Sequence, residues 1–363
     1  MIRVLAAGID SLYLSVRGEL RDGVLQVFDT MRSFPLNEDE PIPFHFRDDE
    51  GTGGFLLRTH GWRGFKTWLS SPRYELMFGG PKALPAAYVQ LHSAFIHTVG
   101  IGEAIAEVVD VLRAHFIPHP TLTVSRVDLY ADTQGWKPQP EQFEHFVCRG
   151  VKRRLFEQPC ERHAHGRRLA GMTFGKGAVV ARLYDKTLEL SQRGQTWPSA
   201  IWQDHNPAVP VWRVEFQFRR DALHSFGLSS VGDVLHQAQA LWEYGTCWLS
   251  LRTPTRAVRR SNWPEVAAWV ELRGAQLGEP CNALVRERIR QATERRLLAG
   301  WVGYTTSLAA LGQETEIHAT LRRVEPAAVR YLSERGVVFA ELVEQKRQRQ
   351  LDARRHLVRV GQQ

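Results

Sequence analysis

Residues Thr173 to Glu189 read TFGKGAVVARLYDKTLE, a pattern that predicts a strand, a glycine turn, a second strand and the first turn of a helix. Gly175 and Gly177 permit the positive φ values that a tight hairpin needs. The run from Val179 to Tyr184 is β-branched and apolar enough for a buried strand. A β-hairpin is therefore expected at this point of the chain.

One face of the second strand combines a phenol with two cations. A period of two places Arg182, Tyr184 and Lys186 on the same side. Cations so placed bind a phosphodiester oxygen and favour a phenolate over a phenol. The pattern predicts Tyr184 as a nucleophile with Arg182 and Lys186 as catalytic partners. It is also typical of an ordinary core strand that ends in solvated cations.

Two further segments alternate fully polar and fully apolar positions. In VSRVDLYADTQGW, from Val124 to Trp136, and in VWRVEFQFRR, from Val211 to Arg220, every second residue is polar. The polar positions are Arg126, Asp128, Tyr130 and Asp132 in the first segment, and Arg213, Glu215, Gln217 and Arg219 in the second. Carboxylates near a core are costly unless cations or donors satisfy them. If these strands share a sheet with Tyr184, their polar faces converge on one acidic patch rimmed by arginine.

Three motifs, in order, resemble the rolling-circle replication initiators of plasmids and phages, in the branch of replication initiation factors that includes relaxases of mobile elements. They are RVDLYAD (Arg126 to Asp132), FGKGAVVARLYDK (Phe174 to Lys186) and RVEFQFR (Arg213 to Arg219). The opening GIDSLYLSV (Gly8 to Val16) is similar to the first strand of that family. The resemblance covers roughly residues 5 to 225 and leaves the last third unmatched.

The resemblance implies a metal-dependent nickase of the HUH-like type, which attacks one DNA strand with a tyrosine and keeps the 5′ phosphate as a phosphotyrosine ester. The matching tyrosine is Tyr184. Oxygen ligands suit Mg²⁺ or Mn²⁺, and the strand faces indicate Asp128, Asp132 and Glu215 as ligands, with Asp10 as a weaker fourth. The family also implies an origin hairpin or single strand as substrate, a host helicase as partner and a homodimer.

Two other features compete for these roles. Tyr130 lies between two carboxylates, which oppose phenolate formation unless a metal intervenes. His163-Ala164-His165 is the His-hydrophobic-His pair that binds metal in the wider superfamily of tyrosine nickases. Because its surroundings are polar and charged, we expect a solvated basic loop there and no metal site.

The charge favours an anionic polymer as partner. The 363 residues carry 47 Lys and Arg against 39 Asp and Glu, a net charge of +8, and all but seven of the basic residues are Arg. Arginine suits bidentate contact with phosphate. Between Phe55 and Phe78, cations interleave with aromatics, as in surfaces that track single-stranded DNA but also in ordinary sheets. The predicted DNA-binding residues are Arg63, Lys66, Arg126, Lys176 and Arg213.

The length allows two domains. More strands than helices up to residue 225 favour an α+β fold with an antiparallel sheet, and helical spacing with many arginines follows from 226 to 363. We therefore predict a catalytic domain over 1–225 and a helical domain over 226–363. No apolar run reaches membrane-spanning length, so a cytoplasmic location without membrane contact is expected. A non-catalytic DNA-binding regulator and a nuclease with water as nucleophile stay open as alternatives.

Overall fold

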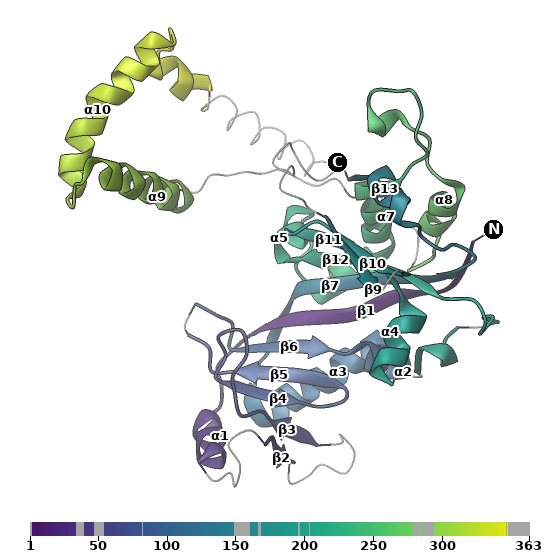
Figure 1. The fold of residues 1–363 in the computed structure, drawn as a ribbon. Helices are drawn as coiled ribbons and strands as arrows, with labels where there is room; N and C mark the ends of the chain where they lie inside the picture. The colour runs from purple at the N-terminus through teal and green to yellow at the C-terminus, as the bar shows by residue number, and fades with distance from the viewer. Residues whose placement is uncertain are drawn as a thin grey trace, which may run out of the picture. The chain divides into compact units, whose positions relative to one another are not determined.

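The chain has an α+β fold built on one large antiparallel sheet (Figure 1). A computed structural model describes residues 2–33, 40–46, 54–81, 83–148, 160–165, 168–194, 197–202, 204–278, 284, 294–345 and 347. Within these residues the chain divides into two compact units, Met1–Arg286 and Glu287–Gln363. The predicted fold class is confirmed, and the sheet belongs to the first unit.

The sheet has eleven strands in the order β2-β3-β4-β5-β6-β1-β7-β12-β11-β10-β9. Their bounds are β1 Arg3–Arg17, β2 Ile42–Phe44, β3 Phe55–Leu57, β4 Thr67–Ser70, β5 Tyr74–Phe78, β6 Ala87–Leu91, β7 Thr121–Gln134, β9 Cys160–His165, β10 Arg168–Phe174, β11 Val179–Asp185 and β12 Trp212–Arg219. The two long strands β1 and β7 lie side by side in its middle (Figure 1). Strands β8 (Phe146–Cys148) and β13 (Leu249–Leu251) form a separate pair.

The helices of the first unit are short. They are α1 Val24–Arg32, α2 Ser93–Val99, α3 Ile101–Val111, α4 Lys186–Arg193, α5 Arg220–Ser225, α6 Val231–His236, α7 Ala238–Trp248 and α8 Ala267–Arg273. A π-helical turn, Leu112–Phe116, continues α3, and 3₁₀ turns span Pro140–His145, Trp197–Ala200 and Arg260–Asn262. The α4 helix starts directly after β11, and its N-cap Asp185 accepts a hydrogen bond from the Leu188 amide at 3.0 Å. The tyrosine strand is thereby tied to a helix start.

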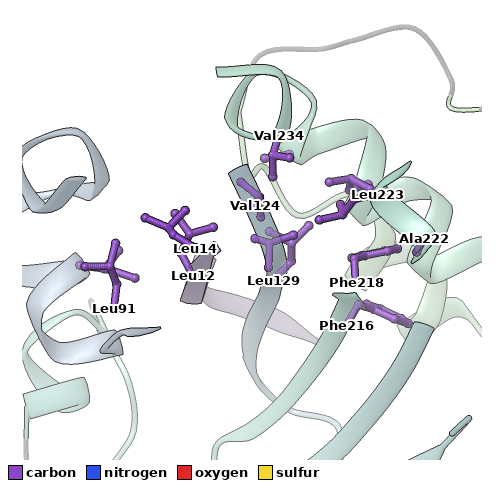
Figure 2. Packing of buried hydrophobic residues seen from close by; sticks show 14 of the residues in the cluster. Leu12, Leu14, Leu91, Val124, Leu129, Phe216, Phe218, Ala222, Leu223 and Val234 are labelled. Atoms are coloured by element: carbon purple, nitrogen blue, oxygen red, sulfur yellow. The ribbon is translucent and has the colours of Figure 1, made fainter. Parts of the chain in front are cut away.

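The apolar face of the sheet forms the core. Alternation along β1, β7 and β12 sends every second side chain to this face, where helices cover it. Figure 2 shows the packing of Leu129, Phe216 and Phe218 toward Ala222 and Leu223 of α5. The ring of Phe216 also meets Trp242 of α7 edge-on, with centroids 5.4 Å apart. The opposite, polar face of the same strands is left for the site.

The domain boundary predicted after residue 225 is wrong. Helices α5 to α8 fill the core of the sheet unit, because Leu223, Leu241 and Trp269 belong to the same buried cluster as Phe216. The chain instead divides at Arg286. The second unit is helical, with α9 over Glu294–Gly312 and α10 over Ile317–Glu334. None of the helices that the structure describes is both long and apolar enough to cross a membrane.

Gly245 allows α7 to pack closely on β12. A Cβ at Gly245 would lie 2.7 Å from Cγ of Phe216, which is shorter than a normal contact distance between two carbon atoms. We expect Gly245→Ala to lower the free energy of unfolding by about 1–3 kcal/mol, because a core ring must move. Gly232→Ala in α6 meets nothing closer than 3.9 Å and serves as the control. Urea titration followed by circular dichroism measures both, and equal midpoints for the two variants would contradict this packing.

Candidate functional site

The strand register joins the three predicted polar faces into one. Tyr184 on β11 lies opposite Arg213 on β12, which lies opposite Asp132 on β7. The neighbouring row pairs Arg182 with Glu215 and Glu215 with Tyr130. Opposite residues of an antiparallel pair point to the same face. The convergence expected from alternation is therefore present, and β1 closes the face on the far side of β7.

Arg213 holds the centre of this face. Its Nε and Nη2 donate to the two carboxylate oxygens of Asp132 at 2.6 and 2.7 Å, and its Nη1 donates to Asp10 Oδ1. The indole Nε1 of Trp202 donates to Asp132 Oδ2 at 2.8 Å. Arg213 and Asp132 are fully buried. Burial alone would raise the pKa of Asp10. The charge of the adjacent Arg213 and weaker contributions from other neighbours together outweigh this effect, so the pKa of Asp10 lies below its ordinary value.

A β-bulge brings Asp10 to the polar face. The register of β1 against β7 shifts between Ile9 and Ser11, so Asp10 is the extra residue. Strict alternation would group Asp10 with buried Leu12 on the apolar face. The bulge instead lets two successive residues serve the site: Asp10 accepts from Ser93 Oγ at 2.8 Å, and Ser11 Oγ donates to Asp128 at 2.9 Å. These serine contacts have no signal in the sequence.

Asp128 is neutralised by its neighbour on the same strand. Arg126 donates from Nε to Asp128 Oδ1 at 2.8 Å and from Nη2 to Asp128 Oδ2. The guanidinium carbon of Arg126 also lies 4.3 Å from the ring centroid of Tyr13. Burial raises the pKa of Asp128, whereas Arg126 opposes that rise. Arg126 is thus both a rim cation of the site and the partner of a buried acid.

Among the described side chains of the polar face, a hydrogen bond joins the phenol of Tyr184 to the carboxylate of Glu215. The Tyr184 hydroxyl donates to Glu215 Oε2 at 3.2 Å, and Arg182 Nη1 lies 3.2 Å from Glu215 Oε1. Glu215 is 4% exposed, whereas the Arg182 side chain is 42% exposed. Gly171 lies opposite Tyr184 on β10, where a Cβ would lie only 3.0 Å from Tyr184 Cβ. Glycine at this position leaves room for the tyrosine.

Lys186 is held on the other side of the phenol. It is 5% exposed, and its Nζ lies 5.7 Å from the Tyr184 ring centroid. Its charge is paired with Glu189 Oε2 at 2.5 Å, one turn along α4. Arg193 reaches the other oxygen of Glu189 at 3.3 Å. The sequence analysis indicated Lys186 but missed Glu189. Glu189 follows Lys186 by three residues and precedes Arg193 by four, and this helical spacing could have suggested that Glu189 pairs with both.

A pocket of about 830 Å³ opens over this face. Its floor is the polar side of β1, β7, β12 and β11, and its walls come from α4 and from the segment around His92 and Ser93. The lining includes Asp10, Tyr13, Arg126, Asp128, Arg182, Tyr184, Lys186, Arg193 and Glu215. The pocket therefore offers one phenol, paired acids and several cations to a polar ligand.

Tyr184 is a phenol in this setting. Burial first, and then the charge of Glu215, raise the pKa of Tyr184 well above its ordinary value. The expectation that Arg182 and Lys186 favour the phenolate is wrong, because both cations are paired with acids. Burial, with Asp128 and Asp10 nearby, raises the pKa of Glu215 to about 7. An attack by Tyr184 thus needs a base, and Glu215 is in contact with its proton.

The predicted metal site does not fit the arrangement of these acids. Asp132 and Asp128 each accept hydrogen bonds from an arginine on both carboxylate oxygens. Of the three predicted metal ligands, only Glu215 is not held by an arginine on both oxygens. Across the described ranges, no three His, Cys, Asp or Glu side chains gather closely enough to hold a metal ion. We therefore derive no chemical step through a metal.

The other predicted residues separate into two groups. Arg213 cannot contact DNA as predicted, because it is 0% exposed and fully engaged. Tyr130 is also buried, under the Arg213 guanidinium at 3.9 Å, and does not line the pocket. Lys176, Arg63 and Lys66 are exposed, the first in the β10–β11 turn and the other two between β3 and β4.

The His-Ala-His stretch is a strand and not the loop that we expected. It lies in β9, where the backbone of His163 pairs with Gly171 and so adds a strand beside the Tyr184 hairpin. The side chains of His163 and His165 lie outside the described part of the chain. The prediction that this pair forms no metal site is therefore not tested.

Comparison with profiles of known protein families finds no match. The chain is 21% identical over 288 residues to the uncharacterized protein ORF430 of Pseudomonas phage Pf1, a match over 67% of this chain and 62% of the phage protein. Among solved structures, it is similar to a rolling circle replication initiator protein from Geobacillus stearothermophilus, with TM-score 0.41, 15% identity, and coverage of 76% of this chain and 96% of that one. It is also similar to a Methanococcus jannaschii TBP, with TM-score 0.25, 13% identity, and coverage of 67% and 95%.

The buried ion pair predicts a large stability effect. Arg213→Met leaves Asp132 and Asp10 without their cation, so we expect the free energy of unfolding to fall by about 3–5 kcal/mol. Arg219→Met, an exposed arginine on the same strand, should change it by less than about 0.5 kcal/mol. Urea titrations of both variants at neutral pH measure the difference. Equal losses would mean that the buried pair does not stabilise the sheet.

Proposed function

We propose that this protein nicks and rejoins one strand of DNA through a covalent bond to Tyr184. The observation that carries the proposal is the Tyr184–Glu215 hydrogen bond at 3.2 Å, at the floor of a pocket lined by cations. Among the described tyrosines, Tyr184 alone combines pocket exposure with direct contact to an acid whose pKa lies near neutrality. A nucleophile in contact with a base whose pKa lies near the working pH is the arrangement that general base catalysis uses.

The proposed step follows from these contacts. Tyr184 Oη attacks the phosphorus of a phosphodiester while its proton passes to Glu215 Oε2. The bond from phosphorus to the 3′ oxygen breaks, and that oxygen leaves as a hydroxyl after taking a proton from solvent. The 5′ phosphate stays on Tyr184 as an ester, whose energy is close to that of the broken bond. The reverse reaction rejoins a strand, with Glu215 returning the proton.

Arg182 is the cation best placed to stabilise the transition state. It lies 3.2 Å from Glu215, and 42% of its side chain is exposed toward the pocket opening, so a phosphate oxygen can reach it. Lys186 is buried and its charge is paired with Glu189, so its proposed role is to hold the start of α4 beside the Tyr184 ring and not to activate the phenol. Arg126, on the far side of Glu215, offers a further cation to the DNA backbone.

The biological setting that we propose is initiation of rolling-circle replication of a plasmid or phage. The three ordered motifs support it, and so does a relative encoded by a Pseudomonas phage. A conjugative relaxase would use the same chemistry, and the target DNA distinguishes the two. Recruitment of a host helicase and a homodimer are predictions of the resemblance that separate binding experiments test. The resemblance also implies a Mn²⁺ or Mg²⁺ requirement, which the arrangement of Asp128, Asp132 and Glu215 does not support, so it is tested by comparing Mn²⁺ with EDTA.

Covalent capture of DNA tests the nucleophile. Single-stranded oligonucleotides that tile the replicon encoding the chain are incubated with the protein, with Mn²⁺ or with EDTA, and resolved on denaturing gels. We expect an SDS-stable adduct that Tyr184→Phe abolishes while DNA binding persists, because only the attacking oxygen is removed. Tyr130→Phe, which alters a buried phenol outside the pocket, should keep the adduct.

Other outcomes would replace the proposal. Cleavage without any adduct would indicate a nuclease that uses water. Undiminished nicking by Tyr184→Phe would exclude Tyr184 as the nucleophile. DNA binding without cleavage or adduct on every oligonucleotide of the tiling set would indicate a non-catalytic DNA-binding regulator.

The pH dependence of nicking tests the base. Glu215 must be ionised to accept the phenol proton, and its pKa is raised to about 7, so the single-turnover rate should rise through neutral pH and level off above it. Glu215→Gln should lower the rate by roughly 10²–10⁴-fold and remove that rise. Glu189→Gln, an acid of the same pocket bound to Lys186, should keep it. An unchanged profile in Glu215→Gln would assign the base elsewhere.

A further inference from the structure

The polar face of the sheet continues beyond the pocket, across β6, β5 and β4. Tyr13, at one end of the pocket, lies opposite Gln90 on β6, and the next row joins Ser15, Tyr88 and Met77 up to Trp68 on β4. Because the strands form one continuous sheet, Tyr88 and Trp68 lie on the same face as Arg126 and Tyr184. Figure 1 shows these strands running on from β1 without a break.

Aromatic rings line this continuation. The rings of Trp62 and Trp68 are stacked with centroids 5.9 Å apart, and Phe65 stacks on Tyr88 at 6.1 Å. Tyr88 lies 6.3 Å from Tyr13, which lines the pocket. We call Trp62, Trp68, Tyr88 and Tyr13 the aromatic face. It leads from the outer strand β4 to the pocket of Tyr184.

The aromatic face is only partly open to solvent, because Tyr13 at its pocket end and Met77, which lies between Tyr88 and Trp68, are buried. Trp62, Trp68 and Tyr88 are half-buried, whereas Leu69 and Val89, which alternate with them, are fully buried in the core. Packing on the core therefore does not account for these rings. Tyr88 and Trp68 lie in one row of the sheet with buried Met77 between them, and Trp62 stacks on Trp68. Half-buried rings so placed are a surface on which flat apolar groups can stack.

Cations accompany the rings. The guanidinium carbon of Arg63 lies 4.0 Å from the Trp62 ring centroid, and that of Arg58 lies 5.4 Å from the Trp68 centroid. Arg63 and Gly64 form the two-residue turn of a tight hairpin, with φ of 50° and 89°, closed by hydrogen bonds between Trp62 and Phe65. This turn holds Arg63 over the ring and leaves Lys66 exposed beside it.

We infer that the aromatic face binds the unpaired bases of the DNA strand whose phosphate enters the pocket. Stacking on Trp62, Trp68 and Tyr88 would hold successive bases, and Arg58, Arg63 and Lys66 would contact the backbone between them. This inference rests on the proposed function. From β11 to β4 is six strand spacings, about 29 Å at about 4.8 Å each. That span suits a single strand of several nucleotides. The bases of a paired helix are stacked inside it and cannot reach the rings, so the inference is for unpaired DNA.

Binding of oligo(dT) of increasing length tests the inference. The Tyr184→Phe protein is titrated with fluorescein-labelled dT4, dT8 and dT16, so that cleavage does not interfere. We expect affinity to rise with length, and Trp62→Ala to weaken dT16 about tenfold while leaving dT4 unchanged. The matched control is Trp263→Ala, which removes another half-buried indole under an arginine, at 5.7 Å from Arg260, outside the aromatic face.

A second measurement needs no substitution on the aromatic face, so it does not depend on whether a variant folds. Photocrosslinking of oligonucleotides that carry 5-iododeoxyuridine, followed by mass spectrometry, should place adducts on Trp62, Trp68 or Tyr88. Adducts confined to other aromatics would overturn the inference. So would equal loss of affinity in Trp62→Ala and Trp263→Ala, or duplex DNA bound as tightly as dT16. Covalent capture by the unmodified protein that persists in Trp62→Ala with unchanged dT16 affinity would leave the proposed function standing and refute only this inference.

Discussion

The buried pair of Arg213 and Asp132 is the constraint on which the sheet and its site depend. A fully buried guanidinium is costly to desolvate, and the cost is offset only while both carboxylates, Asp132 and Asp10, stay within hydrogen-bond distance. The three residues come from β12, β7 and the bulge of β1. A shift of any one strand by one residue would turn its polar set into the core and leave a charge unpaired. The pair therefore specifies the register of the whole polar face.

The same constraint shapes the chemistry of the pocket. Because arginines donate to both oxygens of Asp132 and to both oxygens of Asp128, these carboxylates are held in place as hydrogen-bond acceptors for their neighbours. Glu215 is itself buried, its partners are only the half-exposed Arg182 and the Tyr184 hydroxyl, and the carboxylates of Asp128 and Asp10 lie nearby. Its pKa rises for that reason, which turns one acid of the cluster into a proton acceptor near neutral pH. Similar residues thus take different roles because their partners differ.

Much of the fold follows from local alternation, but the partners across strands do not. The period of two around Asp128 and Glu215 correctly predicted two polar strand faces, and the convergence with Tyr184 is confirmed by the register. The bulge at Asp10 breaks that period, so strand patterns could not place its side chain. Whether Arg182 and Lys186 activate or only surround the phenol depended on Glu215 and Glu189, which alternation does not pair with them. The change in sequence pattern near residue 225 marked a change from strands to helices and not a domain boundary, because the helices that follow pack on Phe216.

In the proposed function, a single continuous sheet would also link DNA recognition to reaction. The strands that carry Trp68 and Tyr88 pair in unbroken register with β1, and β1 pairs with the strand of Asp128. Sheets resist shear along their strands because each hydrogen-bonded row must break together. Groups bound at the outer strands are therefore held at a fixed offset from Tyr184, without any moving part. Such rigidity is what positioning of a phosphodiester for in-line attack requires, since an error of one ångström costs most of the advantage of proximity. In the proposed reaction, the extension of the sheet to β4 would thus serve the chemistry as well as binding.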